Sequence, residues 1–348
     1  MLIVKARAWL VLGASALVLP AVFMVARRHV AGSSCGTPFD LRDAPNDGFG
    51  GTDGRDFRFR AGRTEEPGLK GSAQAAPSGP SRAGYVFPED LVKGEVGGYP
   101  GEKYARWGLP STVLFFIAAN HRSPETLELV RRSFADEAAL PKAVIIETEP
   151  TRPPDYCTTG GGRGSEGCVA KNLAEQKKTA VIFGEYAPPE QLAAIEARGR
   201  FSRRDYEGFW LVRTMTGNGN RAAKFDSFDA MFAKLTEEFR EEFEVSDGMF
   251  RTPDEFSAWY EEGNRKERGS LRRRFKALDP KEAWAAGDLL TQRVLAESLV
   301  VKDVHVGRLI AGAAAEFGSV LVIYGGAHYE DLRPALDQML GPPREIGR

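Results

Sequence analysis

The chain has 348 residues, of which 47 are Lys or Arg and 48 are Asp or Glu, so its net charge is close to zero. This balance provides no basic face for nucleic acid, and 42% hydrophobic with 27% charged residues is typical of a globular protein. Three cysteines are too few for a disulfide scaffold or a four-sulfur zinc site. An apolar core must therefore hold the fold, and the four histidines can be considered one by one.

The amino terminus predicts a membrane segment. Residues 8–26 contain no charged side chain over 19 positions, which is close to the length that crosses a bilayer core. Arg27 and Arg28 follow directly, whereas a cleaved signal peptide, the alternative, usually has a shorter apolar stretch and a small-residue cleavage site. We predict a membrane anchor over residues 1–30 that contacts the lipid bilayer through residues 8–26. The flanking charges are nearly balanced, and we expect the main domain to be extracytoplasmic, in the periplasm.

Composition divides the rest of the chain into a linker and one domain. Residues 31–103 are rich in Gly, Pro, Ser, Asp and Arg and show no apolar period. Such a segment buries too little apolar surface to offset the entropy lost on ordering, so we predict a disordered linker. Residues 104–343 alternate short apolar runs with helical patterns, which indicates an α/β domain. No strand is expected between about residues 200 and 300, where we predict a helical insertion.

Four apolar runs have the length and composition of strands buried on both faces. These runs cover residues 111–118, 143–146, 179–183 and 319–324. Helices are expected after Ser123-Pro124-Glu125 and over residues 169–178, 188–198, 225–243, 252–264, 279–301 and 303–317. The predicted fold is a mostly parallel sheet flanked by helices.

Polar side chains gather where the predicted strands end. The residues that follow the four strands are His121, Glu147, Glu185 and His328. Because carboxyl ends of parallel strands share one edge of a sheet, where ligands bind, we expect these side chains to converge. Two imidazoles and a carboxylate are a known ligand set for a catalytic divalent metal, so we predict a metal bound by His121, Glu147 and His328. Glu149 or Glu185 would act as the general base.

Simpler interpretations exist for several of these residues. A histidine at the end of a strand is commonly a hydrogen-bonded loop residue, and Glu185 could belong to the loop that leads into a helix. His305, within a predicted helix, is expected to be structural. Cys157 and Cys168 flank a Gly-rich loop, where a disulfide would suit an oxidising compartment, but their spacing leaves the pairing open.

Three short segments resemble, in order and spacing, the TraB/GumN/Tiki superfamily. They are AANH at 118–121, VIIE at 144–147 and VIYGGAH at 322–328. The resemblance implies a membrane-associated or extracytoplasmic metal-dependent hydrolase, with erythromycin esterases and the haem-binding ChaN proteins as distant relatives. The Gly-Thr of many members is replaced here by Ala118-Ala119. The family's Arg-Asp pair before the last strand corresponds to Lys302-Asp303 in this chain. The resemblance therefore implies a catalytic role for Asp303. Arg293 would supply the guanidinium that Lys302 lacks.

These patterns predict a membrane-anchored hydrolase of the peptidase or esterase type, acting on a peptide or a small ester. The ion would be manganese, cobalt, zinc or iron, which the ligand set does not resolve. Two alternatives belong to other classes. One is a haem- or metal-binding module that uses the same histidines without turnover, and the other is a degenerate scaffold whose helical region binds a protein partner.

Overall fold

The computed structural model describes residues 85–94, 104–109, 111–150, 156–157, 164–264 and 270–347. The predicted membrane anchor and most of the predicted linker lie outside these residues. Within the part that is described, no helix combines the length and the apolar character needed to span a bilayer.

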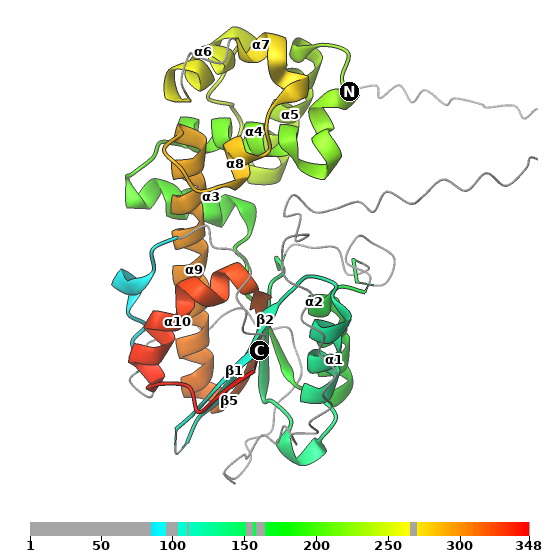
Figure 1. Ribbon diagram of the computed structural model, residues 1–348, viewed down its shortest axis with the longest axis vertical. Coiled ribbons are helices and arrows are strands. Elements are labelled where there is room, and N and C mark those ends of the chain that lie inside the picture. The colour runs from blue at the N-terminus through cyan, green and yellow to red at the C-terminus, as the bar shows by residue number, and fades with distance from the viewer. Residues whose placement is uncertain are drawn as a thin grey trace, which may run out of the picture. The chain divides into compact units, whose positions relative to one another are not determined.

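A six-stranded, mostly parallel sheet forms the centre of the α/β region, with the strand order β4-β3-β5-β2-β1-β6 (Figure 1). The strands are β1 (Tyr104–Gly108), β2 (Val113–Ala119), β3 (Ala143–Ile146), β4 (Ala180–Phe183), β5 (Ser319–Gly325) and β6 (Glu345–Gly347). Strands β4, β3, β5 and β2 are parallel to one another, and β1 is antiparallel to both of its neighbours. The four parallel strands confirm the predicted runs to within two residues at each end, whereas β1 and β6 were not predicted.

Helices cover both faces of this sheet, which explains why its central strands are continuous apolar runs. The covering helices are α1 (Pro124–Ser133), α2 (Glu166–Lys177), α9 (Leu290–Phe317) and α10 (Gly326–Leu340). Alternate side chains of β2 and β5, such as Phe116 and Val322, belong to the core on the side of α9 and α10. Their neighbours Phe115 and Ile323 belong to the core on the side of α1 and α2. Figure 1 shows the two helix pairs on opposite sides of the strands.

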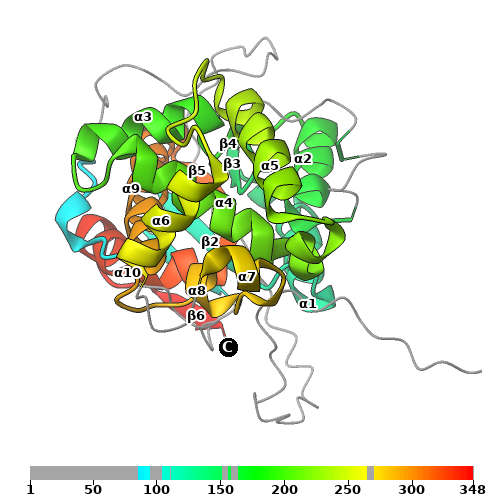
Figure 2. The ribbon, with the colours of Figure 1, turned by 90° about the horizontal axis from the view of Figure 1, so that it is seen from above.

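The described residues between 200 and 301 contain no strand, as expected for the predicted helical insertion. Helix α3 (Pro188–Arg198) precedes this stretch, whose helices are α4 (Arg203–Asn220), α5 (Phe228–Phe243), α6 (Pro253–Gly263), α7 (Leu271–Arg274) and α8 (Lys281–Trp284). Helix α4 lies at its centre and contacts α3, α5, α6, α8 and α9 (Figure 2). The core of this region is largely aromatic.

One helix differs from the predicted boundaries. Separate helices were expected over residues 279–301 and 303–317, but α9 runs through Lys302 and Asp303 without a break. No Gly or Pro stands at this junction, so nothing in the backbone ends the helix there. The break lies earlier, after α8, where the segment 285–289 includes Gly287. Helix α9 therefore contacts α4 in the insertion as well as β3 and β5 in the sheet.

Residues 85–94 differ from the disordered linker predicted over this part of the chain. Phe87 and Val92 are buried in the core on the α9 side, and Glu89 pairs with Arg308 of α9 at 2.6 Å. An added Cβ at Gly307 would lie 2.1 Å from the Phe87 ring, so this glycine is what allows the ring to approach α9. The apolar surface that these two side chains bury accounts for the order of this segment. The average composition of the whole linker gave no sign of it.

Candidate metal centre

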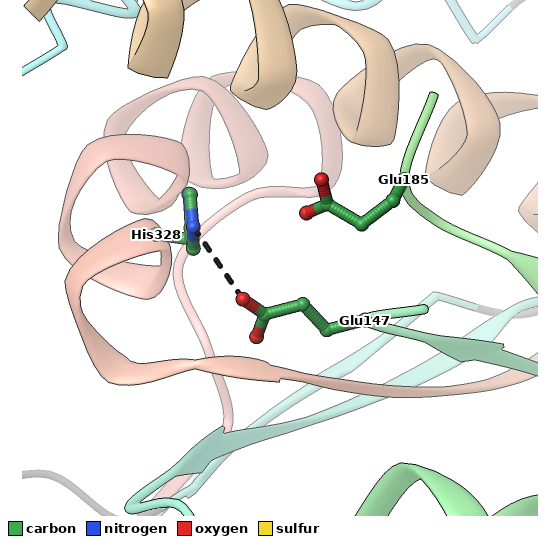
Figure 3. Close-up of side chains that lie close together, drawn as sticks. All are labelled: Glu147, Glu185 and His328. Atoms are coloured by element: carbon green, nitrogen blue, oxygen red, sulfur yellow. Dashed lines mark ion pairs between the residues drawn. The ribbon is translucent and has the colours of Figure 1, made fainter. Parts of the chain in front are cut away.

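The four predicted residues lie at the carboxyl edge of the parallel strands. Glu147 follows β3 directly, and Glu185 comes two residues after β4. His121 comes two residues after β2, and His328 lies in the first turn of α10, which begins where β5 ends. Figure 3 shows Glu147, Glu185 and His328 directing their side chains into one space. The shared edge of the sheet thus brings together residues that lie far apart in the sequence.

The distances between these groups suit a single ion. Nε2 of His121 lies 4.0 Å from one carboxylate oxygen of Glu147, and Nε2 of His328 lies 3.8 Å from the other. Ligand atoms of Glu147, Glu185 and His328 all lie within 4.8 Å of one another, and the predicted ligand His121 does not belong to this group. Two ligands that each bind one ion at about 2.1 Å are at most about 4.2 Å apart. The two histidine–Glu147 distances fall below that limit.

Gly325, at the end of β5, marks the point where the predicted ligands meet. A Cβ added there would lie 3.1 Å from Oε2 of Glu147, 3.4 Å from Nε2 of His121 and 3.5 Å from Cδ2 of His328. The Gly325 N–H also donates a 2.5 Å hydrogen bond to Oε2 of Glu147. Glycine therefore keeps space open among the three side chains and fixes the direction of the central carboxylate.

Each histidine is oriented by a carboxylate behind it. Nδ1 of His121 lies 2.5 Å from Oε1 of Glu166, and Nδ1 of His328 lies 2.6 Å from Oδ1 of Asp303. Metal-binding histidines characteristically donate their second ring N–H to a carboxylate, which fixes the ring and its tautomer. In both cases Nε2 is left facing Glu147. This arrangement is the one expected of ligands.

The same carboxylates make both imidazoles basic in the protein without metal. The hydrogen bond to Glu166 raises the pKa of His121 to about 9, with the charge of Glu147 adding to it. Burial opposes protonation of His328, but the Asp303 carboxylate outweighs it and raises the pKa of His328 to about 9. A cation that binds Nε2 of either ring must therefore displace a proton.

Glu185, one of the two predicted bases, is held in an ion pair. Its carboxylate lies 2.5 Å from Nζ of Lys302 and accepts a 2.6 Å hydrogen bond from the Tyr324 hydroxyl. Burial alone would raise the pKa of Glu185, but the Lys302 ammonium lowers it to about 2. An efficient general base has a pKa near the working pH. The geometry therefore favours Glu185 as a permanent anion at the centre over Glu185 as the base.

The remaining predicted residues lie outside the cluster. Asp303 is fully buried behind His328, so it positions that ring and does not face the centre. Glu149 follows β3 in the chain but does not belong to the group of converging ligand atoms. Arg293 lies upstream on α9 with its guanidinium 6.0 Å from the centre of the Phe201 ring, in a different pocket. This position does not support the interpretation that Arg293 takes the place of the family's arginine beside the metal.

Glu166 is the main site residue that the sequence did not predict. It follows Ser165, the N-cap of α2, and an acidic residue in the first turn is the usual pattern of a helix start. That pattern therefore gives no sign of its contact with His121. Two residues further, Cys168 forms a disulfide with Cys157, which resolves the pairing that the sequence left open.

His305 lies apart from the candidate centre, as its structural interpretation predicts. Its ring stacks on Tyr186 with the ring centroids 3.7 Å apart. Burial lowers the pKa of His305 to about 4, so the ring is neutral at physiological pH. It is the natural control for the two site histidines.

No protein-family model, curated protein or solved structure matches this chain. The resemblance to the TraB/GumN/Tiki superfamily remains a hypothesis based on the three short segments. The case for a function thus depends on the geometry of the site.

Proposed function

We propose that the protein is a hydrolase whose centre is one divalent cation bound by Nε2 of His121, Nε2 of His328 and the carboxylate of Glu147. The observation that carries this proposal is that both imidazoles place Nε2 within 4.0 Å of the Glu147 carboxylate, each ring backed by its own carboxylate. A divalent cation, when bound, supplies Lewis-acid polarisation of a substrate carbonyl. Two imidazoles with carboxylates fit manganese, cobalt, zinc and iron alike, so the metal stays open.

The residues around the ligands then have separate tasks. Glu166 and Asp303 hold the two imidazoles with Nε2 forward, and Lys302 keeps Glu185 ionised beside Glu147. The side chain of His121 is 55% exposed, so this side of the centre is the one that a peptide or small ester would approach. Glu149 remains the proposed proton acceptor, because Glu185 is too weak a base.

A cation without a porphyrin fits this geometry better than haem. The Glu147 carboxylate lies within 4.0 Å of both Nε2 atoms, and a carboxylate beside two imidazoles is a ligand set for a divalent cation. A Soret band on titration with haem, with no hydrolysis, would favour the binding-module alternative.

The proposed setting is a domain tethered to a membrane through residues 8–26 and facing the periplasm. The disulfide between Cys157 and Cys168 supports an oxidising compartment. Membership of the TraB/GumN/Tiki superfamily is part of the same proposal, since its members combine this setting with metal-dependent hydrolysis.

The test compares full-length protein with His121→Ala, His328→Ala and the matched control His305→Ala. Elemental analysis measures bound metal, and a panel of fluorogenic peptides and nitrophenyl esters measures hydrolysis with each of the four metals. We expect the two site variants to lose both metal and turnover, and the control to keep both. Metal-dependent turnover that survives in both site variants would refute the proposal.

A fourth variant, Glu149→Gln, separates metal binding from proton transfer. If Glu149 accepts the proton, this variant keeps its metal and loses turnover by about 100-fold or more. Unchanged turnover with full metal content would assign proton transfer to another group.

A further inference from the structure

A second pocket lies along α9 and shares no residue with the candidate metal centre. Its volume is about 560 Å³, within the range of sites for small molecules. Three segments line it: Lys93 and Gly94, then Arg200 and Phe201 between α3 and α4, and the stretch from residue 286 to Val300. Arg293, which the sequence assigned to catalysis, is one of the lining residues.

The charge of this lining is positive. Among the described lining residues, Lys93, Arg200 and Arg293 are basic and Glu297 alone is acidic. The Glu297 side chain is only 4% exposed and already binds two guanidiniums, that of Arg198 and that of Arg200, the latter at 3.1 Å. Its charge is therefore neutralised within the protein, and an excess of positive charge remains.

Two of the basic residues have no carboxylate partner among the described residues. Neither Lys93 nor Arg293 forms an ion pair with another residue in the part of the chain that the structure describes. Arg293 instead places its guanidinium over the Phe201 ring. A guanidinium stacked in this way still presents its N–H groups, whose planar fork matches the oxygens of a phosphate or carboxylate.

The walls of the pocket are held in place before any ligand binds. Gly94 has φ +67°, and a Cβ added there would lie 2.2 Å from the carbonyl oxygen of Ala296, so the segment before it meets α9 backbone to backbone. On the other side, the two arginines on Glu297 fix the segment between α3 and α4. A preformed pocket binds with little loss of conformational entropy.

We propose that this pocket binds a small organic anion with a phosphate or carboxylate group on an apolar or aromatic body. The anionic group lies against Arg293 and Lys93, and the body contacts Phe201, Ala296 and Val300. The volume is far larger than inorganic phosphate alone requires. This assignment is independent of the proposed hydrolase activity, because no residue is shared between the two sites.

The test is isothermal titration calorimetry of the full-length protein with phenyl phosphate, benzoate and inorganic phosphate. We expect phenyl phosphate or benzoate to bind more tightly than inorganic phosphate, and the tighter of the two identifies the anionic group. Arg293→Gln should weaken that binding about tenfold or more. Arg293→Lys, which keeps the charge and loses the fork, should give an intermediate affinity.

The matched control is Arg273→Gln, an exposed arginine on α7 outside the pocket, which should change the affinity less than about twofold. No binding of either aromatic anion to the unaltered protein would overturn the proposal. So would equal weakening by Arg273→Gln.

Discussion

The two histidines of the candidate centre have the same partners in kind but different surroundings. The exposed arm consists of His121 and Glu166, whose side chains are 55% and 8% exposed. The buried arm consists of His328 on α10 and Asp303 on α9, whose side chains are 11% and 1% exposed. Both arms direct Nε2 at Glu147. Similar ligand geometry can thus be built from a solvated loop or from packed helices.

Metal binding and the stability of the fold therefore need not depend equally on the two arms. Both imidazoles should matter to a bound ion, but only the buried arm is also part of the core. Four predictions test this difference between the two arms.

The largest effect is expected from removing each ligand. His121→Ala and His328→Ala should each weaken metal binding by more than about 100-fold, beyond the effect of losing an orienting partner. Only His328→Ala should strongly destabilise the fold, by about 3 kcal/mol, because Asp303 is fully buried and its Oδ2 already lacks a partner among the described residues. Loss of His121 should cost less than loss of His328, because the largely buried Glu166 carboxylate keeps a hydrogen bond from the Arg122 N–H and its exposed partner His121 is easily replaced by water.

Metal titration and urea unfolding of both variants, with His305→Ala as control, measure these effects. Equal losses of stability in the two site variants would contradict the division into an exposed and a buried arm.

The disulfide is expected to stabilise the exposed arm. Cys157 and Cys168 are separated by 11 positions, and closing a loop of this length should contribute about 3 kcal/mol to the free energy of unfolding. Because Cys168 lies two residues after Glu166 in the first turns of α2, loss of the bond should also weaken metal binding. Unfolding and metal titration of the Cys157→Ser, Cys168→Ser double variant check both effects. An unchanged metal affinity would show that the loop does not position Glu166.

A smaller effect is expected when an orienting carboxylate loses its charge. Glu166→Gln and Asp303→Asn should each weaken metal binding by about 10- to 100-fold while the ligands remain. Glu175→Gln, on the exposed part of α2 and paired only with Lys171, serves as the matched control and should have no effect. If both orienting variants bind metal as the unaltered protein does, the carboxylates have only a structural role.

A further effect is a dependence of stability on pH in the metal-free protein. The pKa values of His121 and His328 are raised from 6.5 to about 9, so their protonation stabilises the fold fully below pH 6.5. This stabilisation is lost as pH rises through about 9. Thermal unfolding with a chelator should therefore show a falling midpoint from pH 6.5 to 9.5. Metal affinity should rise over the same range, because the imidazoles bind the ion without their protons.

His305→Ala should keep this alkaline slope, because the pKa of His305 is lowered to about 4 and its titration lies outside the window. The slope should be reduced in His121→Ala and in His328→Ala. A slope that persists unchanged in both would show that other groups titrate.

The parallel strands and their terminal residues could be predicted because each strand is a continuous buried run. Parallel pairing then brings the strand ends to one edge, which is why His121, Glu147, Glu185 and His328 meet. Strands β1 and β6 could not be predicted in the same way. Strand β1 alternates buried and half-buried positions at one side of the sheet, and β6 has only 3 residues.

The partners of these residues could not be derived from local patterns. Glu166 lies 45 positions from His121, and Lys302 lies 117 positions from Glu185. Such contacts depend on how helices pack on the sheet. Because α9 is continuous, Lys302 and Asp303 point about 100° apart around its axis, and each reaches a different site residue. Because the sequence analysis placed a helix end at this point, it could not predict that these two neighbours contact different site residues.

The most direct test of the candidate centre is anomalous diffraction from crystals of the protein grown with manganese. We expect one strong anomalous peak about 2.0 to 2.3 Å from Nε2 of His121, Nε2 of His328 and a carboxylate oxygen of Glu147. A fully ordered site with no peak at millimolar manganese, or a peak that one of the two imidazoles does not reach, would contradict it.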